Sequence, residues 1–399
     1  MGKKHSFLPA SSAGRWMPCP GSAYIATLYP EKTSANAEEG TLAHELAAYE
    51  IDNRDTDHKD AAYKKGRTAI KKKVDAFYKD HPELDESFTT MSKALEPYID
   101  YVIARYQEAL DGDASAVLMT EQRVEFGEYV QGGFGTSDVV IIGGGRATVI
   151  DLKYGKGVPV SAINNPQIRL YAIGAVNAFD LVYDFDEVAV VIYQPRLDSV
   201  TEEVLTVDAL KAWAADEVKP AADLALSDNP PYNPGPWCHN YFCPAAGSCK
   251  ARAKAALAAE EFSDRDPALL SDEELSDALT RAELLASWVK DLQAFALSEA
   301  LDGAEIPGWK VVEGRANRKY KDEGAVAAAA IEAGYAEAMI YEKKLLTLSA
   351  MEKLMGKKQF HEVMETSGLV YKPQGSPTLA PETDKRPAFN TATNDFKED

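Results

Sequence analysis

Two aspartates and a lysine of this chain flank a glycine-rich turn, in a pattern that brings acidic and basic groups together. Between Asp138 and Lys153 lie two apolar runs separated by Gly144 and Gly145, the short loop that a two-residue hairpin turn prefers. Counting outward from this turn places Asp138 opposite Asp151, with Cβ atoms roughly 5 Å apart. Lys153 shares the face of Asp151, because side chains alternate along a strand. The pattern therefore predicts two facing carboxylates with a lysine beside them.

This acidic pair indicates a cation site. Facing carboxylates on an apolar sheet repel each other unless a positive charge lies between them. Mg²⁺ or Mn²⁺ suits two carboxylates, and such an ion suits phosphodiester cleavage because it polarises the phosphate and lowers the pKa of an attacking water. Lys153 would orient that water or stabilise charge that builds up on the phosphate. The alternative is a surface salt bridge between Lys153 and a neighbouring acid.

Two helices are expected to add polar groups to this site. On a predicted helix over residues 38–51, His44 lies off the apolar stripe, although a histidine that simply packs in the core is the alternative. A second helix opens at Pro166 with Asn165 as its cap. Gln167 and Tyr171 lie four residues apart on one face of it, where a helix N-terminus can meet a phosphate. For the tyrosine, core packing is the alternative.

Together these residues resemble the RecB-type nucleases of the PD-(D/E)XK superfamily. Four motifs occur in the order of that family: G-x-x-x-H from Gly40 to His44, G-x-x-D from Gly135 to Asp138, D-x-K from Asp151 to Lys153 and Q-x-x-x-Y from Gln167 to Tyr171. One departure is Ser137, where Pro often precedes the aspartate. The resemblance implies that His44, Asp138, Asp151 and the carbonyl of Leu152 bind metal, that Lys153 assists catalysis, that Gln167 and Tyr171 contact DNA, and that Glu121 is an accessory acid.

The four cysteines extend this resemblance. They are Cys19, before the nuclease motifs, and Cys238, Cys243 and Cys249, after them. Disulfides are an alternative, but nothing else in the sequence indicates an oxidising compartment. Four thiolates suit a [4Fe–4S] cluster or zinc. The AddB and CRISPR-adaptation branches of the RecB-type nucleases carry a [4Fe–4S] cluster in this layout, which joins the two ends of the domain. The C-x4-C spacing keeps zinc, His239 as a substitute ligand, and unligated thiols as alternatives.

The order of expected elements is typical of an α/β fold with a mixed sheet flanked by helices. Helices are expected over 38–51, 61–78, 95–110, 207–225 and 269–301, and strands over 117–126, 137–142, 147–153, 188–193, 200–207 and, more weakly, 309–312, with short helices continuing to about 366. The sequence predicts a nuclease domain over 1–264, a mainly helical region over 265–370 and a disordered tail over 371–399.

Composition limits the class of protein. The 399 residues carry a formal charge of −20 and are 45% hydrophobic, without the ~20-residue apolar run of a membrane span. A cytoplasmic protein is expected, in the host cytoplasm if a phage encodes it. The charge argues against a broad nucleic-acid surface. Locally, however, the acid-free stretch 61–73 holds six cationic residues, which form either a DNA-facing strip or a solvated helix face.

The resulting hypothesis is a metal-dependent DNA nuclease, most simply an exonuclease acting on DNA ends or single strands in phage recombination or replication. The wider sequence is similar to a family of phage-encoded RecB-like proteins. The absence of a Walker A motif indicates that no nucleotide cofactor is bound. The alternatives are a module of the same fold that binds DNA ends or a protein without cleaving, and a zinc-bound scaffold. In the C-terminal third, a basic cluster beside Trp309 and Tyr320 is a candidate contact for DNA, and the acidic tail around Phe396 for a single-strand-binding or annealing protein. The cluster consists of Arg315, Arg318, Lys319 and Lys321. The alternative is a helical appendage that stabilises the protein and ends in a flexible tail.

Overall fold

A computed structural model describes most of the chain, in two units. The described residues are 6–30, 34–84, 86–258 and 270–312, followed by 323–334, 336, 340–341, 351, 355–366 and 369–370. The first unit is Met1–Val312 and the second is Glu313–Asp399. No helix within the described residues is both long and apolar enough to span a bilayer.

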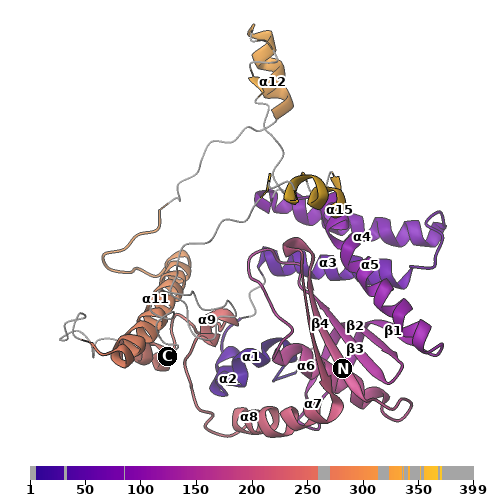
Figure 1. The fold of residues 1–399 in the computed structure, drawn as a ribbon. Helices are drawn as coiled ribbons and strands as arrows, with labels where there is room; N and C mark the ends of the chain where they lie inside the picture. The colour runs from indigo at the N-terminus through magenta and orange to yellow at the C-terminus, as the bar shows by residue number, and fades with distance from the viewer. Residues whose placement is uncertain are drawn as a thin grey trace, which may run out of the picture. The chain divides into compact units, whose positions relative to one another are not determined.

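A five-stranded mixed sheet forms the centre of the first unit (Figure 1). Its strands, in spatial as well as chain order, are β1 (Val117–Glu125), β2 (Phe134–Gly143), β3 (Arg146–Leu152), β4 (Glu187–Gln194) and β5 (Ser199–Thr206). The β3 and β4 strands are parallel, and the other neighbours are antiparallel. Gly143 pairs with Arg146, and Gly144 and Gly145 have φ of +58° and +75°, as a two-residue hairpin turn requires. The expected hairpin and its register are therefore confirmed.

Helices cover both faces of the sheet, as expected for an α/β fold (Figure 1). One face packs against α3 (Ala35–Asp52), α4 (Ala61–Asp80) and α5 (Phe88–Gly112), and the other against α6 (Pro166–Phe179), α7 (Val207–Trp213) and the N-terminal segment. Successive β2 residues alternate between the two cores, with Val139 and Ile141 in one and Val140 and Ile142 in the other. Because both faces are buried, the central strands read as continuous apolar runs.

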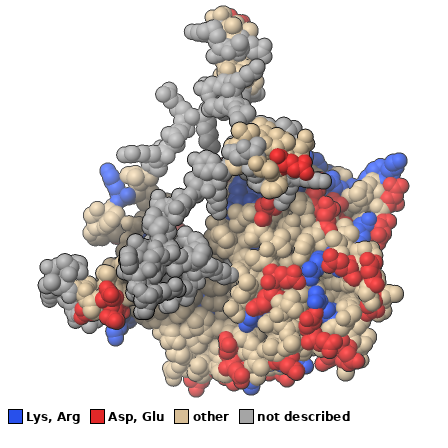
Figure 2. Space-filling model, viewed as in Figure 1, with Lys and Arg blue, Asp and Glu red and all other residues tan. Residues whose placement is uncertain are grey.

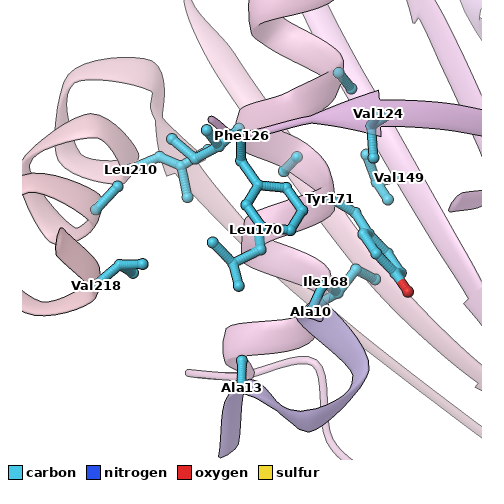
Figure 3. Close-up of a cluster of buried hydrophobic side chains, with 14 of the residues drawn as sticks. Ala10, Ala13, Val124, Phe126, Val149, Ile168, Leu170, Tyr171, Leu210 and Val218 are labelled. Carbon is cyan, nitrogen blue, oxygen red and sulfur yellow. The ribbon is translucent and has the colours of Figure 1, made fainter. Parts of the chain in front are cut away.

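The N-terminal segment lies against the first turns of α6. Its helices are η1 (Ala10–Ser12), α1 (Ala13–Trp16) and α2 (Gly21–Ala26). Figure 3 shows Ala10 and Ala13 beside Ile168 and Leu170, which are fully buried. This packing brings the start of the chain to the helix that follows the acidic hairpin.

Two expected elements differ from the structure. The helix expected over 207–225 consists of α7, a π-helical turn at Ala214–Val218 and α8 (Lys219–Ala225). The short strand expected over 309–312 is wrong, because these residues are not in a strand. Trp309 and Val312 are 75% and 66% exposed, so this apolar run has no sheet against which it could be buried.

Three helices form the end of the first unit. They are α9 (Trp237–Asn240), α10 (Lys250–Leu257) and the long α11 (Asp272–Leu301). Arg252 of α10 is buried and pairs with Asp291 of α11 at 2.5 Å, and His239 Nδ1 lies 3.0 Å from the same carboxylate. A Cβ at Gly247 would lie 2.5 Å from the backbone oxygen of Asp291. The expected domain boundary at 264 therefore separates α11 from the cysteine-bearing segment that it contacts.

This packing predicts a structural role for Asp291. The Asp291→Ala change leaves the buried Arg252 guanidinium without its carboxylate, and we expect it to lower the free energy of unfolding by about 3 kcal/mol. Asp277 is the control, because it forms an exposed pair with Arg281 on the same helix. Asp277→Ala should cost less than about 1 kcal/mol. Urea denaturation of the full-length variants measures both values, and equal losses would contradict a structural role for the α10–α11 contact.

The second unit contains α12 (Glu323–Glu332), α15 (Lys357–Phe360) and the π-helical turn His361–Glu365. Short helices up to about 366 were expected here. The basic cluster at 315–321 and the tail beyond residue 370 lie outside the described residues.

Candidate metal centre

The two aspartates of the hairpin lie at the end of the β2–β3 ladder. Val139 pairs with Ile150, so the register continued by one residue brings Asp138 opposite Asp151. The Leu152 N–H donates to Asp138 Oδ2 at 2.7 Å. The side chain of Asp151 is almost completely buried. The sheet thus holds two carboxylates at one edge of the apolar core.

Lys153 and Gln167 surround the buried carboxylate of Asp151. Lys153 Nζ lies 2.8 Å from Asp151 Oδ2 and forms a salt bridge with it. Gln167 Nε2 donates to Asp151 Oδ1 at 3.1 Å, and Lys153 Nζ donates to Gln167 Oε1 at 3.2 Å. Both oxygens of Asp151 therefore have a polar neighbour, and the three side chains fix one another in place.

The pKa values of Asp151 and Lys153 are both raised. Burial raises the pKa of Asp151; Lys153 opposes the rise, whereas Asp138 adds to it. Burial lowers the pKa of Lys153, but the charges of Asp151 and Asp138 outweigh this effect and leave that pKa raised. A buried carboxylate with a raised pKa gains strongly from a cation placed beside it.

His44 and Glu121 complete a set of ligand atoms around Asp138. His44 Nδ1 lies 3.0 Å from Asp138 Oδ1. Burial lowers the pKa of His44, but the hydrogen bond and charge of Asp138 outweigh burial and raise it. One ligand atom each of His44, Glu121 and Asp138 lies within 4.8 Å of the others, and no other trio of His, Cys, Asp or Glu in the described residues is this close.

Glu121 occupies this place through a strained backbone. Its φ is +45°, a left-handed conformation that is uncommon for glutamate. The ladder between β1 and β2 pairs Thr120 with Val139 and Gln122 with Ser137, but skips Glu121 opposite Asp138. Partial burial and Asp138 raise the pKa of Glu121. Strain of this kind concentrates at functional sites, and the residue expected only as an accessory acid lies in the ligand set.

A cavity of about 580 Å³ opens beside His44 and Glu121. Its lining includes two more acids, Glu45 and Asp52. Lys73 of α4 pairs with Glu45 at 2.5 Å. An acidic mouth of this kind attracts cations and gives them a path to the ligand atoms.

The residues present fit a divalent cation. His44, Asp138 and Glu121 offer the close set of ligand atoms. The buried carboxylate of Asp151, which was expected to bind metal, lies outside this close set and opposite Asp138. Oxygen-rich sets of this kind suit Mg²⁺ or Mn²⁺. Leu152, whose carbonyl was expected to bind metal, is the last residue of β3, between Asp151 and Lys153.

Gln167 and Tyr171 lie on the first turns of α6. Asn165 caps this helix by accepting the N–H groups of Gln167 and Ile168, and Pro166 is its first residue, as expected. Tyr171 is only 7% exposed, and a Cβ at Gly135 would lie 2.6 Å from its ring (Figure 3). The glycine of the G-x-x-D motif is thus required for this ring to pack. Gln167 contacts Asp151, whereas Tyr171 packs in the core and its hydroxyl accepts a hydrogen bond from Gln167 Nε2 at 3.4 Å.

A network behind the site was not expected from the sequence. Arg196 is buried and pairs with Glu39 at 2.9 Å and with Glu86, and its guanidinium lies over the Tyr154 ring. Since Tyr154 follows Lys153 directly, this network holds the backbone beyond the D-x-K motif. The available signal was Glu39, an acid on the otherwise apolar buried face of α3.

The four cysteines meet at the junction of the N-terminal segment and the loop around α9. Cys19, Cys238, Cys243 and Cys249 are free thiols that line one narrow cavity, together with Arg15. Burial raises the pKa of Cys19, Cys238 and Cys243. No three of the thiols lie within 4.8 Å of one another, whereas Zn–S bonds of about 2.3 Å would bring tetrahedral sulfurs to about 3.8 Å. The thiols share a cavity but are not drawn together into a single-ion site.

The basic strip of α4 is partly neutralised. Arg67 pairs with Glu50, Lys71 with Asp75 and Lys73 with Glu45. Basic side chains occur over α4 at the upper right of Figure 2, while acidic side chains predominate below them. Half of the six cations therefore have acidic partners, which weakens the strip as a DNA contact.

Comparison with known proteins gives a family. Residues 5–387 match the family described as "Protein of unknown function (DUF2800)", so the chain belongs to it. A solved structure titled "Crystal structure of SSO0001" is 21% identical and covers 44% of this chain and 79% of that one, with a TM-score of 0.22. A TM-score this low does not indicate a shared fold.

Proposed function

We propose that this member of the DUF2800 family is a metal-dependent DNA nuclease with a PD-(D/E)XK fold of the RecB type. The observation that carries the proposal is the close set of ligand atoms of His44, Asp138 and Glu121 beside the buried Asp151 carboxylate. Lys153 Nζ, at 2.8 Å, is the salt-bridge partner of Asp151. The carboxylates of Asp138 and Glu121 still lie close together, and a cation placed between them would balance their charge.

Each residue then has a part in phosphodiester hydrolysis. His44, Asp138, Asp151 and Glu121, with the Leu152 carbonyl, would hold Mg²⁺ or Mn²⁺, which polarises a phosphate and lowers the pKa of a nearby water. Lys153 carries a positive charge to the point where negative charge builds up on the phosphate. Gln167 holds Lys153 and Asp151 in place through its two hydrogen bonds. The positive end of the α6 dipole would favour the DNA backbone near this site.

We further propose that the four cysteines hold a [4Fe–4S] cluster. In such a cluster each thiolate binds a different iron, so its sulfurs lie further apart than around one zinc ion. The shared cavity supports a common ligand for the four thiols, although the thiols are not arranged around a cluster in this structure. The cluster would join Cys19, near the start of the nuclease domain, to the loop that follows its last strand.

The cellular role remains part of the proposal. An exonuclease that acts on DNA ends or single strands in phage recombination or replication would meet single-strand-binding or annealing proteins in the host cytoplasm. The acidic charge of the chain favours such local contacts over broad DNA binding.

A cleavage assay tests this function directly. Purified protein is incubated with end-labelled linear DNA and with circular DNA, in single- and double-stranded form, with Mg²⁺, Mn²⁺, Ca²⁺ or a chelator. We expect cleavage of linear DNA with Mg²⁺ or Mn²⁺ and none with the chelator. Binding of DNA ends without cleavage under every condition would instead favour the non-cleaving module.

The ligand role of Glu121 gives a separate prediction. Glu121→Gln keeps the size of the side chain but removes its charge, and we expect Mn²⁺ affinity to fall about 10–100-fold. Glu121→Gly should also weaken binding, yet raise the free energy of unfolding by about 1 kcal/mol because glycine tolerates the strained φ. Calorimetric titration and urea denaturation give the two values. The control is Glu125→Gln on the same strand, whose carboxylate pairs with Arg123 at the surface. Unchanged affinity in Glu121→Gln would remove this residue from the ligand set.

A further inference from the structure

Phe242 has the least expected conformation in the cysteine loop. It lies between Cys238 and Cys243, has φ of +49° and is 82% exposed. A left-handed backbone is a genuine outlier for a bulky residue, and the exposed ring gains little by burial. The ring therefore contributes nothing to folding that would offset its backbone strain.

The loop nevertheless fixes this conformation. The Phe242 N–H donates to His239 O at 3.1 Å and the Cys243 N–H to Cys238 O at 3.0 Å. Arg15 Nη1 donates to the carbonyls of Tyr241 and Phe242, both at 3.3 Å. Glycine would adopt the same φ without strain. These hydrogen bonds fix the backbone so that the phenylalanine ring lies in solvent, where a ligand can contact it.

The surroundings of the ring favour a polyanion. Residues 229–259 contain no Asp or Glu, although the chain carries a net charge of −20. Lys250 and Lys254 of this segment are exposed, and two further aromatic rings, Tyr232 and Tyr241, are 40% and 39% exposed. Exposed aromatic rings together with nearby basic residues in the sequence are features with which proteins bind single-stranded nucleic acid.

The loop also belongs to the same packed unit as the metal centre. The Tyr241 ring packs so closely on α1 that a Cβ at Gly14 would lie 2.2 Å from it. The α1 helix in turn contacts α6, whose first turn carries Gln167. A strand bound at the loop would thus be held on a rigid extension of the site.

We propose that Phe242 is a stacking platform for a base of single-stranded DNA, with Lys250 and Lys254 near the backbone of the same strand. The proposal deepens the nuclease function and rests on it for the identity of the ligand. The segment 229–259 holds lysines and no acid of its own, and the Asp291 carboxylate that contacts it is paired with Arg252 and His239, so the charge of the segment favours the nucleic acid.

Fluorescence anisotropy with labelled oligo(dT) tests this contact in full-length protein, with Ca²⁺ in place of Mg²⁺ to avoid cleavage. Phe242→Ala should weaken binding about tenfold, the scale of one lost base stack. Phe242→Trp should bind at least as tightly as the parent. The control is Leu181→Ala, which removes a 96% exposed apolar side chain from another loop and should leave the affinity unchanged.

An oligonucleotide without bases separates stacking from charge. On this abasic backbone, the parent and Phe242→Ala should bind equally, because no base is present to stack. Equal affinity of the parent and Phe242→Ala for oligo(dT), or an equal loss on the abasic strand, would overturn the proposal. Because the assay measures binding without cleavage, failure of stacking and failure of nuclease activity are distinguishable.

Discussion

The Asp151→Asn protein is expected to lose metal-dependent DNA cleavage by more than about 10³-fold. Removal of a single transition-state donor costs about 10²–10³-fold, and this change removes a ligand charge that the proposed mechanism requires throughout. Asn is isosteric with Asp, and its Oδ1 can still accept the hydrogen bond from Gln167 Nε2. The measurement is the initial rate of cleavage of end-labelled DNA at saturating Mn²⁺, beside a calorimetric titration of Mn²⁺ binding.

The same change has a cost in stability that must be separated from catalysis. Lys153 is mostly buried and pairs with Asp151, so Asp151→Asn leaves its ammonium without its charged partner and should lower the free energy of unfolding by about 2 kcal/mol. The double variant Asp151→Asn/Lys153→Gln removes both charges and should recover stability, but not activity. Lys153→Ala alone should lose about 10²–10³-fold in rate while still binding Mn²⁺. Undiminished cleavage by a folded Asp151→Asn protein would remove the proposed site.

The acidic hairpin was predictable because its information is local. A two-residue turn at Gly144 and Gly145 fixes the register, and the twofold periodicity of strands then fixes the partner of every residue, including Asp138 and Asp151. The helix at Pro166 was also predictable from local sequence. The Asn165 side chain caps the first N–H groups of the helix, and Pro166 has the φ that the first helical position requires.

Other parts of the site depend on contacts between distant residues. The position of Glu121 results from a left-handed backbone that glutamate does not favour. Backbone propensities therefore could not predict that its carboxylate lies close to His44 and Asp138. The buried pairs of Arg196 likewise connect residues more than a hundred positions apart. Backbone strain and charge pairing between distant residues are determined by the whole fold, so the local sequence predicts them poorly.

The domain boundary expected at residue 264 was likewise based on local composition and not on packing. The composition changes near residue 265, which favoured a separate helical region. Arg252 and Asp291 nevertheless form a buried pair across this change, and α11 lies in the same unit as the sheet. Truncation at 264 would therefore remove part of the packing of the cysteine loop, and a break after residue 312 is the better test of a dispensable C-terminal region.

The change Cys19→Ala is expected to have the second large effect, on stability. Cys19 and Cys238 are 219 positions apart, and closing a loop of that length stabilises a folded chain by about 5 kcal/mol. Anaerobically purified parent protein should be brown and contain about four irons per chain. Cys19→Ala should lose the colour and unfold at a lower urea concentration.

A neighbouring residue provides the control for the cysteine change. Ser22 lines the same cavity without contributing a thiol, so Ser22→Ala should keep the colour, the iron content and most of the stability. If the parent protein is colourless and contains one zinc per chain, the bound metal is zinc and not iron. The metal would still link the two ends of the domain. If Cys19→Ala matched the parent in metal content and in urea midpoint, Cys19 would hold no metal, and the contacts of the N-terminal segment with α6 and the cysteine loop would by themselves account for its position.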